Sequence, residues 1–319
     1  MSKCNFSCSV CKAENILGTA TATTLVVVFS PLQFKVRPPQ EVTFVIGSTL
    51  RLPCAAKSEL STTLAWTMDG ASVLPVNARF LQNNTLVIEN IKKTQKGSYI
   101  CRVSNTLTTI EAKVKITPKV ASCSEIKKYI SSVSGNYVID PDGEGSLAPF
   151  TVFCDMIDKS GVGVTVIGHD SESRTHVYGC DPSGCYSRNI HYTGASLSQL
   201  ARLTKVSSHC EQFIKYECYG SRIFKYGGFA WWVSRDSAKM TYWGGASPGS
   251  GKCACGMTNS CADSSYGCNC DKNDDVWRED SGLLTDKTKL PVKQLRFGDV
   301  YGSEQGYHTL GKLKCFGIT

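Results

Sequence analysis

The sequence predicts a multidomain protein in which an all-β sandwich precedes a larger, disulfide-rich α+β module. The chain has 319 residues, and single hydrophobic cores seldom grow beyond about 250, so two or three domains are expected. Seventeen cysteines against five histidines favour disulfides over metal sites, and hence an extracellular chain, secreted or part of a cell-surface protein. Residues 1–119 carry 14 Lys+Arg and 6 Asp+Glu, whereas residues 120–319 carry 21 of each. A domain boundary is therefore predicted near residue 120.

The overall composition is that of a globular protein. Hydrophobic residues make up 41% of the chain and charged residues 19%, which excludes a disordered polymer. The longest purely apolar run is Leu25–Phe29, far below the roughly 20 residues of a membrane-spanning helix. We expect no membrane span in this chain and no nucleic-acid partner.

Residues 1–30 contain a short copy of a later stretch. Cys11-Lys-Ala-Glu-Asn15 leads into a β-branched run, as does Cys101-Arg-Val-Ser-Asn105, and the two cysteines are 90 residues apart. This element resembles the last two strands of an immunoglobulin domain, so residues 1–30 are interpreted as the tail of a truncated domain. The alternative is a disordered arm that is rich in threonine and valine. A secretory signal peptide fits the stretch poorly, because its apolar core is brief.

Residues 31–119 show strand signals at regular intervals. Trp66 follows Cys54 by 12 positions, and Tyr99 precedes Cys101 by two. This arrangement resembles an immunoglobulin domain of the intermediate type found in cell-adhesion proteins. The resemblance implies that a Cys54–Cys101 disulfide joins two sheets, that Trp66 packs on it, and that the Tyr99 hydroxyl holds the corner. All four residues are structural.

One position departs from that family. An acid usually lies four residues before the tyrosine and pairs with the arginine that corresponds to Arg79, but here the position is Gln95. The buried ion pair is therefore expected to be absent. A neutral hydrogen bond is the most that can replace it.

Two sequons mark candidate glycosylation sites. Asn83-Asn-Thr85 lies on a predicted hairpin turn, which should expose Asn83. Asn5-Phe-Ser7 is also an acceptor. The occupancy of Asn5 depends on whether Met1 is the true start.

The basic first part suggests weak binding of polyanions such as sulfated glycans. Lys92, Lys93 and Lys96 lie together before Tyr99, within one Debye length of about 8 Å. Further candidates on the final two strands are Arg102, Lys113 and Lys115. The alternative is that these are scattered surface charges that keep the domain soluble. The neutral part, residues 120–319, is expected not to bind polyanions.

Residues 120–319 alternate short helices and strands. A helix is expected from Cys123, and a strand over 136–140 should turn at Pro141-Asp-Gly143 into a return strand that contains Cys154. Pairing across that turn predicts a Cys123–Cys154 disulfide. Ser196-Leu-Ser-Gln199 is a capping box that opens an amphipathic helix.

Several motifs in this part recur in a known family. They are Cys123-Ser-Glu-Ile, Val152-Phe-Cys-Asp-Met156, His209-Cys-Glu-Gln212, Phe229-Ala-Trp-Trp-Val-Ser-Arg235, Tyr242-Trp-Gly-Gly245, Lys252-Cys-Ala-Cys-Gly256, Cys268-Asn-Cys-Asp271 and Lys289-Leu-Pro-Val-Lys-Gln-Leu295. Together they resemble the fibrinogen-like domain of neurexin-type contactin-associated proteins, over about residues 123–315. The resemblance implies a disulfide-rich α+β fibrinogen-like fold and a part in cell–cell adhesion. This sequence carries an immunoglobulin domain in place of that family's laminin-type modules.

Two metal hypotheses arise in this module. The cysteines from Cys253 to Cys270 have Cys-x-Cys spacing, unlike the usual zinc pairs, and the module's 12 cysteines can all form disulfides, so zinc is not favoured. An oxygen-rich loop is the candidate calcium site, with Asp271, Asn273, Asp274 and Asp275. Its alternative is a solvated acidic turn, and no cofactor is firmly expected.

Lectin and enzyme functions are not favoured. The lectins of the fibrinogen-like family use a Cys-His segment after a tryptophan pair, whereas Trp231-Trp232 is followed by Val-Ser-Arg-Asp. A packed aromatic core is the expected role of these tryptophans. His169-Asp170-Ser171 contains the residue types of a catalytic triad, but a triad needs them to converge from separate strands.

We therefore expect a non-catalytic extracellular protein that acts in adhesion or recognition and binds extracellular proteins or glycans. The predicted domains are 1–30, 31–119 and 120–319. The alternative function is a structural component of an extracellular matrix, in which the domains are spacers.

Overall fold

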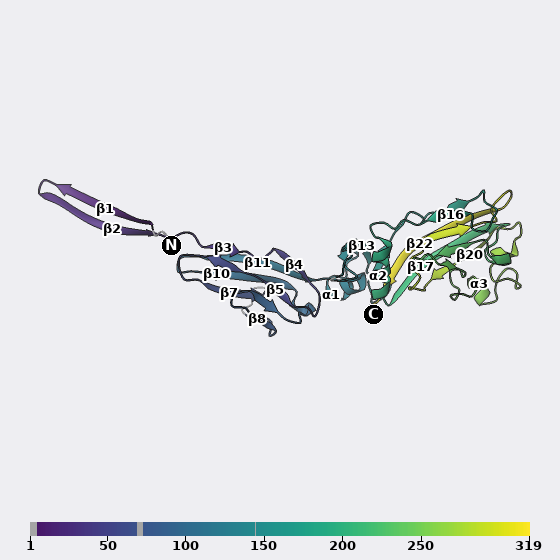
Figure 1. Cartoon of the computed structure of the whole chain (residues 1–319), viewed down its shortest axis with the longest axis horizontal. Coiled ribbons are helices and arrows are strands. Elements are labelled where there is room, and N and C mark those ends of the chain that lie inside the picture. The colour runs from purple at the N-terminus through teal and green to yellow at the C-terminus, as the bar shows by residue number, and fades with distance from the viewer. Residues whose placement is uncertain (1–4, 69–72, 144) are drawn as a thin grey trace. The chain divides into compact units, whose positions relative to one another are not determined.

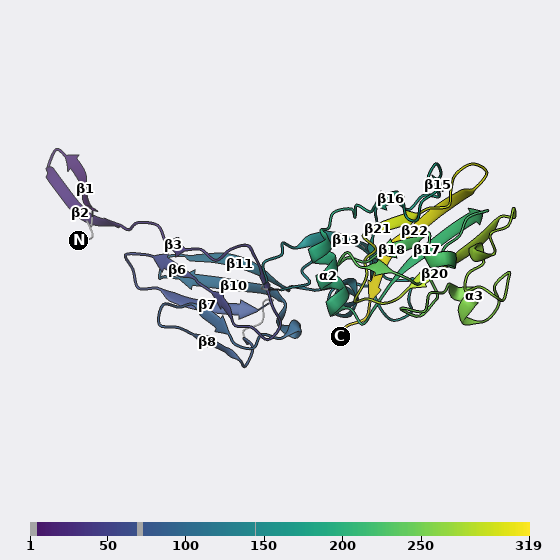
Figure 2. The same cartoon turned by 45° about the vertical axis from the view of Figure 1, so that its right-hand side comes forward.

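The chain divides into two compact units, Met1–Lys119 and Val120–Thr319 (Figure 1). The computed structural model describes residues 5–68, 73–143 and 145–319, without the side chains of residues 5–8 and Leu25. The division falls where the charge composition changes. In Figure 1 and Figure 2 the first unit runs from purple to blue and the second from teal to yellow.

The first unit begins with a two-stranded hairpin, β1 (Asn5–Asn15) and β2 (Gly18–Val28). Cys11 lies opposite Ala22 in it, just as Cys101 lies opposite Ala112 in the last hairpin of the unit. The two stretches that look alike in sequence therefore share one register. The structure describes residues 5–28 as two paired strands.

The turns of the two hairpins are also alike. The Leu17 N–H donates to the Asn15 Oδ1 at 2.9 Å, and the Leu107 N–H donates to the Asn105 Oδ1 at the same distance. An asparagine that accepts a bond from two residues on stabilises a turn locally. The shared Cys-x-x-x-Asn element thus fixes both the turn and the strand that leads into it.

Residues 33–118 form a sandwich of short strands. Its largest sheet has the order β4-β11-β10-β7 and faces the sheet β5-β9-β8, while β3 pairs with β6. The strands are β3 (Gln33–Val36), β4 (Glu41–Phe44), β5 (Leu50–Leu52), β6 (Ala55–Lys57), β7 (Thr63–Met68), β8 (Ala78–Phe80), β9 (Leu86–Ile88), β10 (Gly97–Ser104) and β11 (Thr109–Pro118), with the 3-10 helix η1 (Lys93–Gln95) before β10.

The core of the sandwich is centred on one disulfide. Cys54 and Cys101 are joined at 2.02 Å, and Trp66, 3% exposed, lies opposite Cys101 in the neighbouring strand. The Tyr99 hydroxyl donates to the Gln95 carbonyl oxygen at 3.1 Å. These contacts hold the two sheets and the corner before β10 together.

The second unit contains two sheets and short helices. One sheet has the order β12-β13-β14-β22-β17-β20, with β15 also paired to β22, and the other has the order β16-β21-β18-β19. Its strands are β12 (Gly135–Ile139), β13 (Phe150–Asp155), β14 (Val164–Ile167), β15 (Thr175–Val177), β16 (Tyr186–Asn189), β17 (His209–Tyr219), β18 (Trp231–Val233), β19 (Lys239–Met240), β20 (Arg278–Leu284), β21 (Gln294–Phe297) and β22 (Gln305–Phe316). Its helices are α1 (Cys123–Tyr129), α2 (Leu197–Val206), α3 (Ala254–Met257), η2 (Lys225–Gly227) and η3 (Cys270–Lys272).

The capping box predicted at the start of α2 is confirmed. The Ser196 Oγ accepts a hydrogen bond from the Gln199 N–H at 3.2 Å, and the Gln199 Oε1 accepts one from the Ser196 N–H at 2.8 Å. Leu200 and Leu203 are fully buried on the inner face of the helix. Among the described residues, no helix is long and apolar enough to cross a membrane.

Six disulfides hold the second unit and use all of its cysteines. They join Cys123 to Cys154, Cys180 to Cys185, Cys210 to Cys315, Cys218 to Cys270, Cys253 to Cys268 and Cys255 to Cys261. Three of them lie in or close to the long connection from β19 to β20, which contains only α3 and η3. Disulfides therefore gather where regular strands are missing.

Candidate functional site

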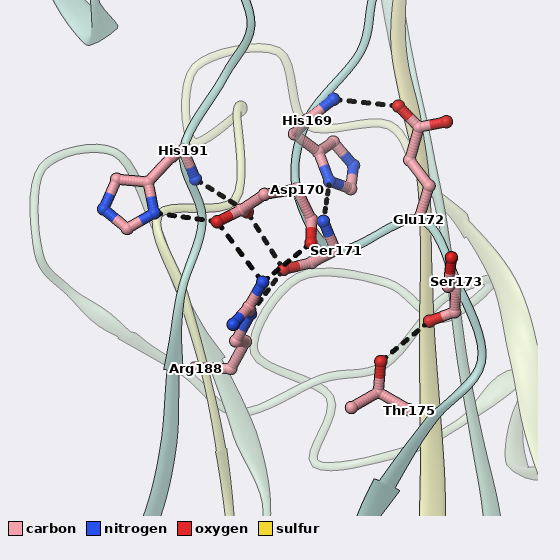
Figure 3. Close-up of polar contacts among 8 residues, drawn as sticks. All are labelled: His169, Asp170, Ser171, Glu172, Ser173, Thr175, Arg188 and His191. Carbon is pink, nitrogen blue, oxygen red and sulfur yellow. Dashed lines mark hydrogen bonds and ion pairs between the residues drawn. The ribbon is translucent and has the colours of Figure 1, made fainter.

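The residues with the chemistry of a catalytic triad meet in a polar cluster that Figure 3 shows. The Asp170 carboxylate accepts hydrogen bonds from the His191 ring at 2.9 Å and from the Ser171 hydroxyl at 3.1 Å. The Arg188 Nε donates to the Ser171 Oγ at 2.7 Å. The His169 Nδ1 accepts a hydrogen bond from the Ser171 backbone N–H at 3.1 Å. The Ser171 hydroxyl thus contacts an acid and a guanidinium and not the imidazole.

Two ionisable groups in this cluster have displaced pKa values. Burial alone would raise the pKa of Asp170, but hydrogen bonds from the His191 backbone and ring and from Ser171 outweigh it and hold the pKa at about 2. Burial lowers the pKa of His169, and a contact of its Nε2 with the Gly311 carbonyl oxygen at 2.9 Å opposes this only in part.

This geometry ties segments of the second unit together. Asp170 and Ser171 precede β15, Arg188 is in β16, and Gly311 is in β22. A nucleophilic serine needs a hydrogen bond from its hydroxyl to a general base. Here the Ser171 hydroxyl donates to a carboxylate whose low pKa makes it a poor base. The cluster is therefore best described as a structural junction.

The candidate calcium loop directs its oxygens at the chain itself. The Asp271 Oδ1 accepts hydrogen bonds from the backbone N–H groups of residues 223–225, at 2.9–3.1 Å. The Asp274 carboxylate is bound by Arg278 at 2.6 Å and by Lys272 at 3.3 Å. Asn273 follows η3 with φ at +54°. The loop therefore already satisfies two of its carboxylates without an ion.

The two carboxylates of this loop are displaced in opposite directions. Burial raises the pKa of Asp271, and the three backbone hydrogen bonds oppose that rise. Hydrogen bonds from Arg278 lower the pKa of Asp274 to about 2. Among the described residues, the carboxylate oxygens of Asp271, Asp274 and Asp275 do not all lie within 4.8 Å of one another.

The cysteines that raised the zinc hypothesis all form disulfides, four of them with one another and Cys270 with Cys218. Cys253 pairs with Cys268 and Cys255 with Cys261, so neither pair offers the thiolates that zinc requires. Within the part of the chain that the structure describes, Cys11 is an exposed cysteine without a disulfide. Cys4 and the side chain of Cys8 lie outside the described residues.

Of the two glycosylation candidates, the structure describes the side chain of Asn83. Asn83 is exposed in the turn between β8 and β9, and its Oδ1 accepts a hydrogen bond from the Thr85 N–H at 3.2 Å. The Thr85 side chain is buried. Asn5 is the first residue of β1, and its side chain lies outside the described residues.

The basic residues of the first unit lie on its surface. Lys92, Lys93 and Lys96 are exposed around η1. On β10 and β11, strand alternation places Arg102, Lys113 and Lys115 on the exposed side. Two of them meet acids, since Arg102 contacts Glu111 at 2.7 Å and Lys115 contacts Glu41 at 3.9 Å. These pairs weaken the positive field of that sheet face.

Sequence reasoning missed the buried ionisable groups of the second unit. Asp299, 1% exposed, pairs with Arg222, whereas the Asp280 carboxylate accepts the N–H groups of Asn269 and Cys270 at 3.0 and 2.9 Å. Burial raises the pKa of Asp280 to about 6. Only the alternation of β20 could have placed Asp280 inward.

His308 is the most isolated of these groups. It is fully buried in β22, and neither ring nitrogen has a hydrogen-bond partner among the described residues. Its ring stacks on Phe297 with 5.7 Å between centroids. Burial lowers the pKa of His308 to about 4, and Arg188 adds to the effect.

Comparison with known proteins relates both units to extracellular families. The family model of the immunoglobulin domain matches residues 33–105. Contactin-associated protein 1 of the rat is 40% identical over 200 residues, which is 61% of this chain and 14% of that protein. Neurexin-4 of Drosophila melanogaster is 38% identical over 192 residues, 57% of this chain and 15% of that protein.

A solved structure of Drosophila OTK, extracellular domains 3–5, is 26% identical with a TM-score of 0.30, over 35% of this chain and 39% of that one. This chain spans about a seventh of the length of the curated relatives above. A match of 200 residues exceeds the first unit, which ends at Lys119, so the homology includes residues of the second.

Proposed function

We propose that this chain is a non-catalytic adhesion or recognition protein whose two units bind extracellular proteins or glycans. The observation that carries the proposal is its homology to contactin-associated protein 1, together with an immunoglobulin domain. Seven disulfides among the described residues suit an extracellular protein. The same homology supports a fibrinogen-like assignment for residues 120–319, and the register of β1 and β2 supports an immunoglobulin-like origin for residues 1–30.

The second candidate is a structural part of an extracellular matrix. The disulfide-rich second unit favours it, since a rigid spacer needs stability and no receptor. The test is to incubate the purified chain with intact cells and with cell-free matrix. Saturable binding to cells supports recognition, whereas recovery in insoluble matrix alone supports the structural alternative.

We also propose that the chain is glycosylated at Asn83, because the exposed turn presents that side chain to solvent. The protein secreted from animal cells should lose mass on glycosidase treatment. Asn83→Gln should remove that loss, or the part of it that does not come from Asn5. An unchanged mass in the wild type would refute the proposal.

Calcium at the acidic loop is a lesser proposal, supported only by the number of oxygens near residues 271–275. It predicts that millimolar calcium raises the melting temperature relative to EDTA. Asp275→Asn should abolish that rise, and Asp263→Asn, elsewhere on the surface, should leave it. Equal melting temperatures with calcium and EDTA would contradict the proposal.

A further inference from the structure

The smaller sheet of the second unit has one buried face and one open face. On β18, Trp232 is fully buried, whereas its neighbour Trp231 is partly exposed. On β21, Leu295 is buried, whereas Arg296 is partly exposed and lies directly opposite Trp231. Alternation along the strands therefore places an indole and a guanidinium side by side on the open face. Trp231 is thus not part of the packed core that the sequence suggested.

A groove of about 480 Å³ runs over this open face. Its lining contains three cations, an indole and small polar residues, and no acid. These residues are Ser183, Gly184, Trp231, Val233, Ser237, Lys239, Lys293, Gln294 and Arg296. The volume falls in the range of roughly 300–1,000 Å³ that small-ligand sites occupy.

The cations of the groove are held by neutral groups. The Lys293 Nζ donates to the Ser237 hydroxyl at 2.7 Å, and the Arg296 Nε donates to the Gln294 Oε1 at 2.7 Å. The Lys239 Nζ lies 3.8 Å from the centroid of the Trp231 ring. In the part of the chain that the structure describes, none of these three cations forms an ion pair.

Ion pairs are absent from the described residues of the groove lining but do form close to it. Lys289, in the same region, contacts the Asp236 carboxylate at 3.0 Å. Charged groups that converge without counter-charges create a strong local field, whatever the net charge of the domain. The groove therefore attracts anions although residues 120–319 carry no net charge.

The indole is held in place by the backbone of a loop. Gly184 has φ at +63°, and a Cβ built on it would lie 1.9 Å from the Trp231 Cη2. The Arg296 Nη1 donates to the Gly184 carbonyl oxygen at 3.2 Å. Any larger residue at position 184 would displace the ring. The loop thus fixes both the aromatic surface and the guanidinium beside it.

We propose that this groove binds an anionic saccharide, one or two sugar units that carry sulfate or carboxylate groups. The indole offers a flat apolar surface for the C–H face of a sugar ring, and the cations can pair with its acidic groups. The Ser237 hydroxyl and the Gln294 amide suit sugar hydroxyl groups. This inference rests on the proposed recognition function and gives its glycan partner a chemical class and a position.

An acidic peptide is the competing ligand. It would use the same three cations, but it would gain little from an indole plate flanked by hydroxyl and amide groups. The two ligands therefore differ in how much they depend on Trp231. The saccharide needs the ring, whereas the peptide needs mainly the charges.

The test is a calorimetric titration of the full chain with a sulfated heparin-derived disaccharide at low salt. Arg296→Gln should weaken binding at least tenfold, and Lys205→Gln, an exposed lysine of α2, should leave it unchanged. Trp231→Ala should also weaken binding at least tenfold. Trp277→Ala is its matched control, because Trp277 is 48% exposed on a strand-flanking segment away from the groove lining.

Three results would overturn the proposal. One is unchanged affinity in both Arg296→Gln and Trp231→Ala, with near-native thermal unfolding of each variant. Another is equal affinity for the unsulfated disaccharide. The third is an acidic peptide of the same charge that binds as tightly and is insensitive to Trp231→Ala. Any of these would leave saturable binding to cells unaffected, so the proposed function and this inference can fail separately.

Discussion

The two units use charged side chains in opposite ways. In the first unit, ion pairs lie on the surface, and Arg102 and Glu111 are 54% and 46% exposed. In the second unit, Asp299 is 1% exposed beneath Arg222, and His308 is fully buried. The first unit has a net charge of +8 and the second has none. Net charge therefore does not indicate where charge matters to the fold or to binding.

The cause of this difference is the amount of regular structure. In the sandwich, backbone groups of paired strands bond to one another. Side chains alternate between the two faces of each strand, so the charged ones point outward. The second unit has long irregular connections, whose backbone N–H groups need other acceptors. Asp271 supplies one for residues 223–225, and Asp280 supplies one for Asn269 and Cys270. Buried carboxylates there replace the missing strand partners.

Removal of a buried charge should have the largest effect on the free energy of unfolding. Asp299→Asn keeps the size of the side chain and tolerates the positive φ of +58° at this position, but it leaves Arg222 without its counter-charge. We expect a loss of about 3 kcal/mol in the free energy of unfolding of the second unit. Denaturant unfolding followed by tryptophan fluorescence measures it.

The matched control for Asp299→Asn is Glu111→Gln in the first unit. It breaks an exposed pair with Arg102, so the expected loss is under about 1 kcal/mol. Equal losses in the two variants would show that burial does not distinguish the units.

His308 should make the second unit sensitive to acid. The unfolded state takes up a proton near pH 6.5, whereas the folded state does so only near its pKa of about 4. The unfolded state is thus favoured as the pH falls from 6.5 to 4. His308→Leu removes this effect and should recover about 2 kcal/mol at pH 5 relative to pH 7.5. Thermal unfolding at the two pH values measures the difference.

Asp280 provides a control of opposite sign. Its pKa is raised to about 6, so it contributes stability that is lost as the pH rises from about 4 to 6. Asp280→Asn should therefore change the pH dependence in the direction opposite to His308→Leu. Parallel pH profiles of the two variants would contradict these assignments.

The neutral corner of the sandwich should have a smaller effect. The Gln95 side chain accepts from the Lys92 N–H at 2.8 Å and donates to the Asn77 amide. Arg79 instead contacts Glu89 on the surface, at 2.8 Å. Gln95→Ala should cost about 1–2 kcal/mol, and Arg79→Ala less than about 1 kcal/mol. Denaturant unfolding measures both costs. A larger cost for Arg79→Ala than for Gln95→Ala would contradict the prediction and show that the ion pair of Arg79 stabilises this corner more than the neutral hydrogen bonds do.

The sequence predicts those parts of the molecule that depend on local patterns. The spacing of Cys54, Trp66 and Cys101 indicates the sandwich, and the cap at Ser196 locates a helix. Asn105 marks a turn in the same way, through its own side chain.

The groove and the long-range disulfides of the second unit, Cys210–Cys315 and Cys218–Cys270, depend on contacts between distant segments. Gly184, Trp231 and Arg296 meet only because β18 pairs with β21, and no local signal gives that register. One signal was present in the sequence. Adjacent residues on a strand face opposite sides of a sheet, so the two tryptophans could not both point into the same core.

The most direct test of the account compares two triple variants of the intact chain on a heparin column. Each loses three positive charges: Lys92, Lys93 and Lys96 to Gln in the first unit, or Lys239, Lys293 and Arg296 to Gln in the second. The account predicts a small decrease in the salt needed for elution for the first variant and a large one for the second. Equal decreases, or a larger one for the first variant, would contradict the claim that convergent, unpaired cations rather than net charge determine where this protein binds anions.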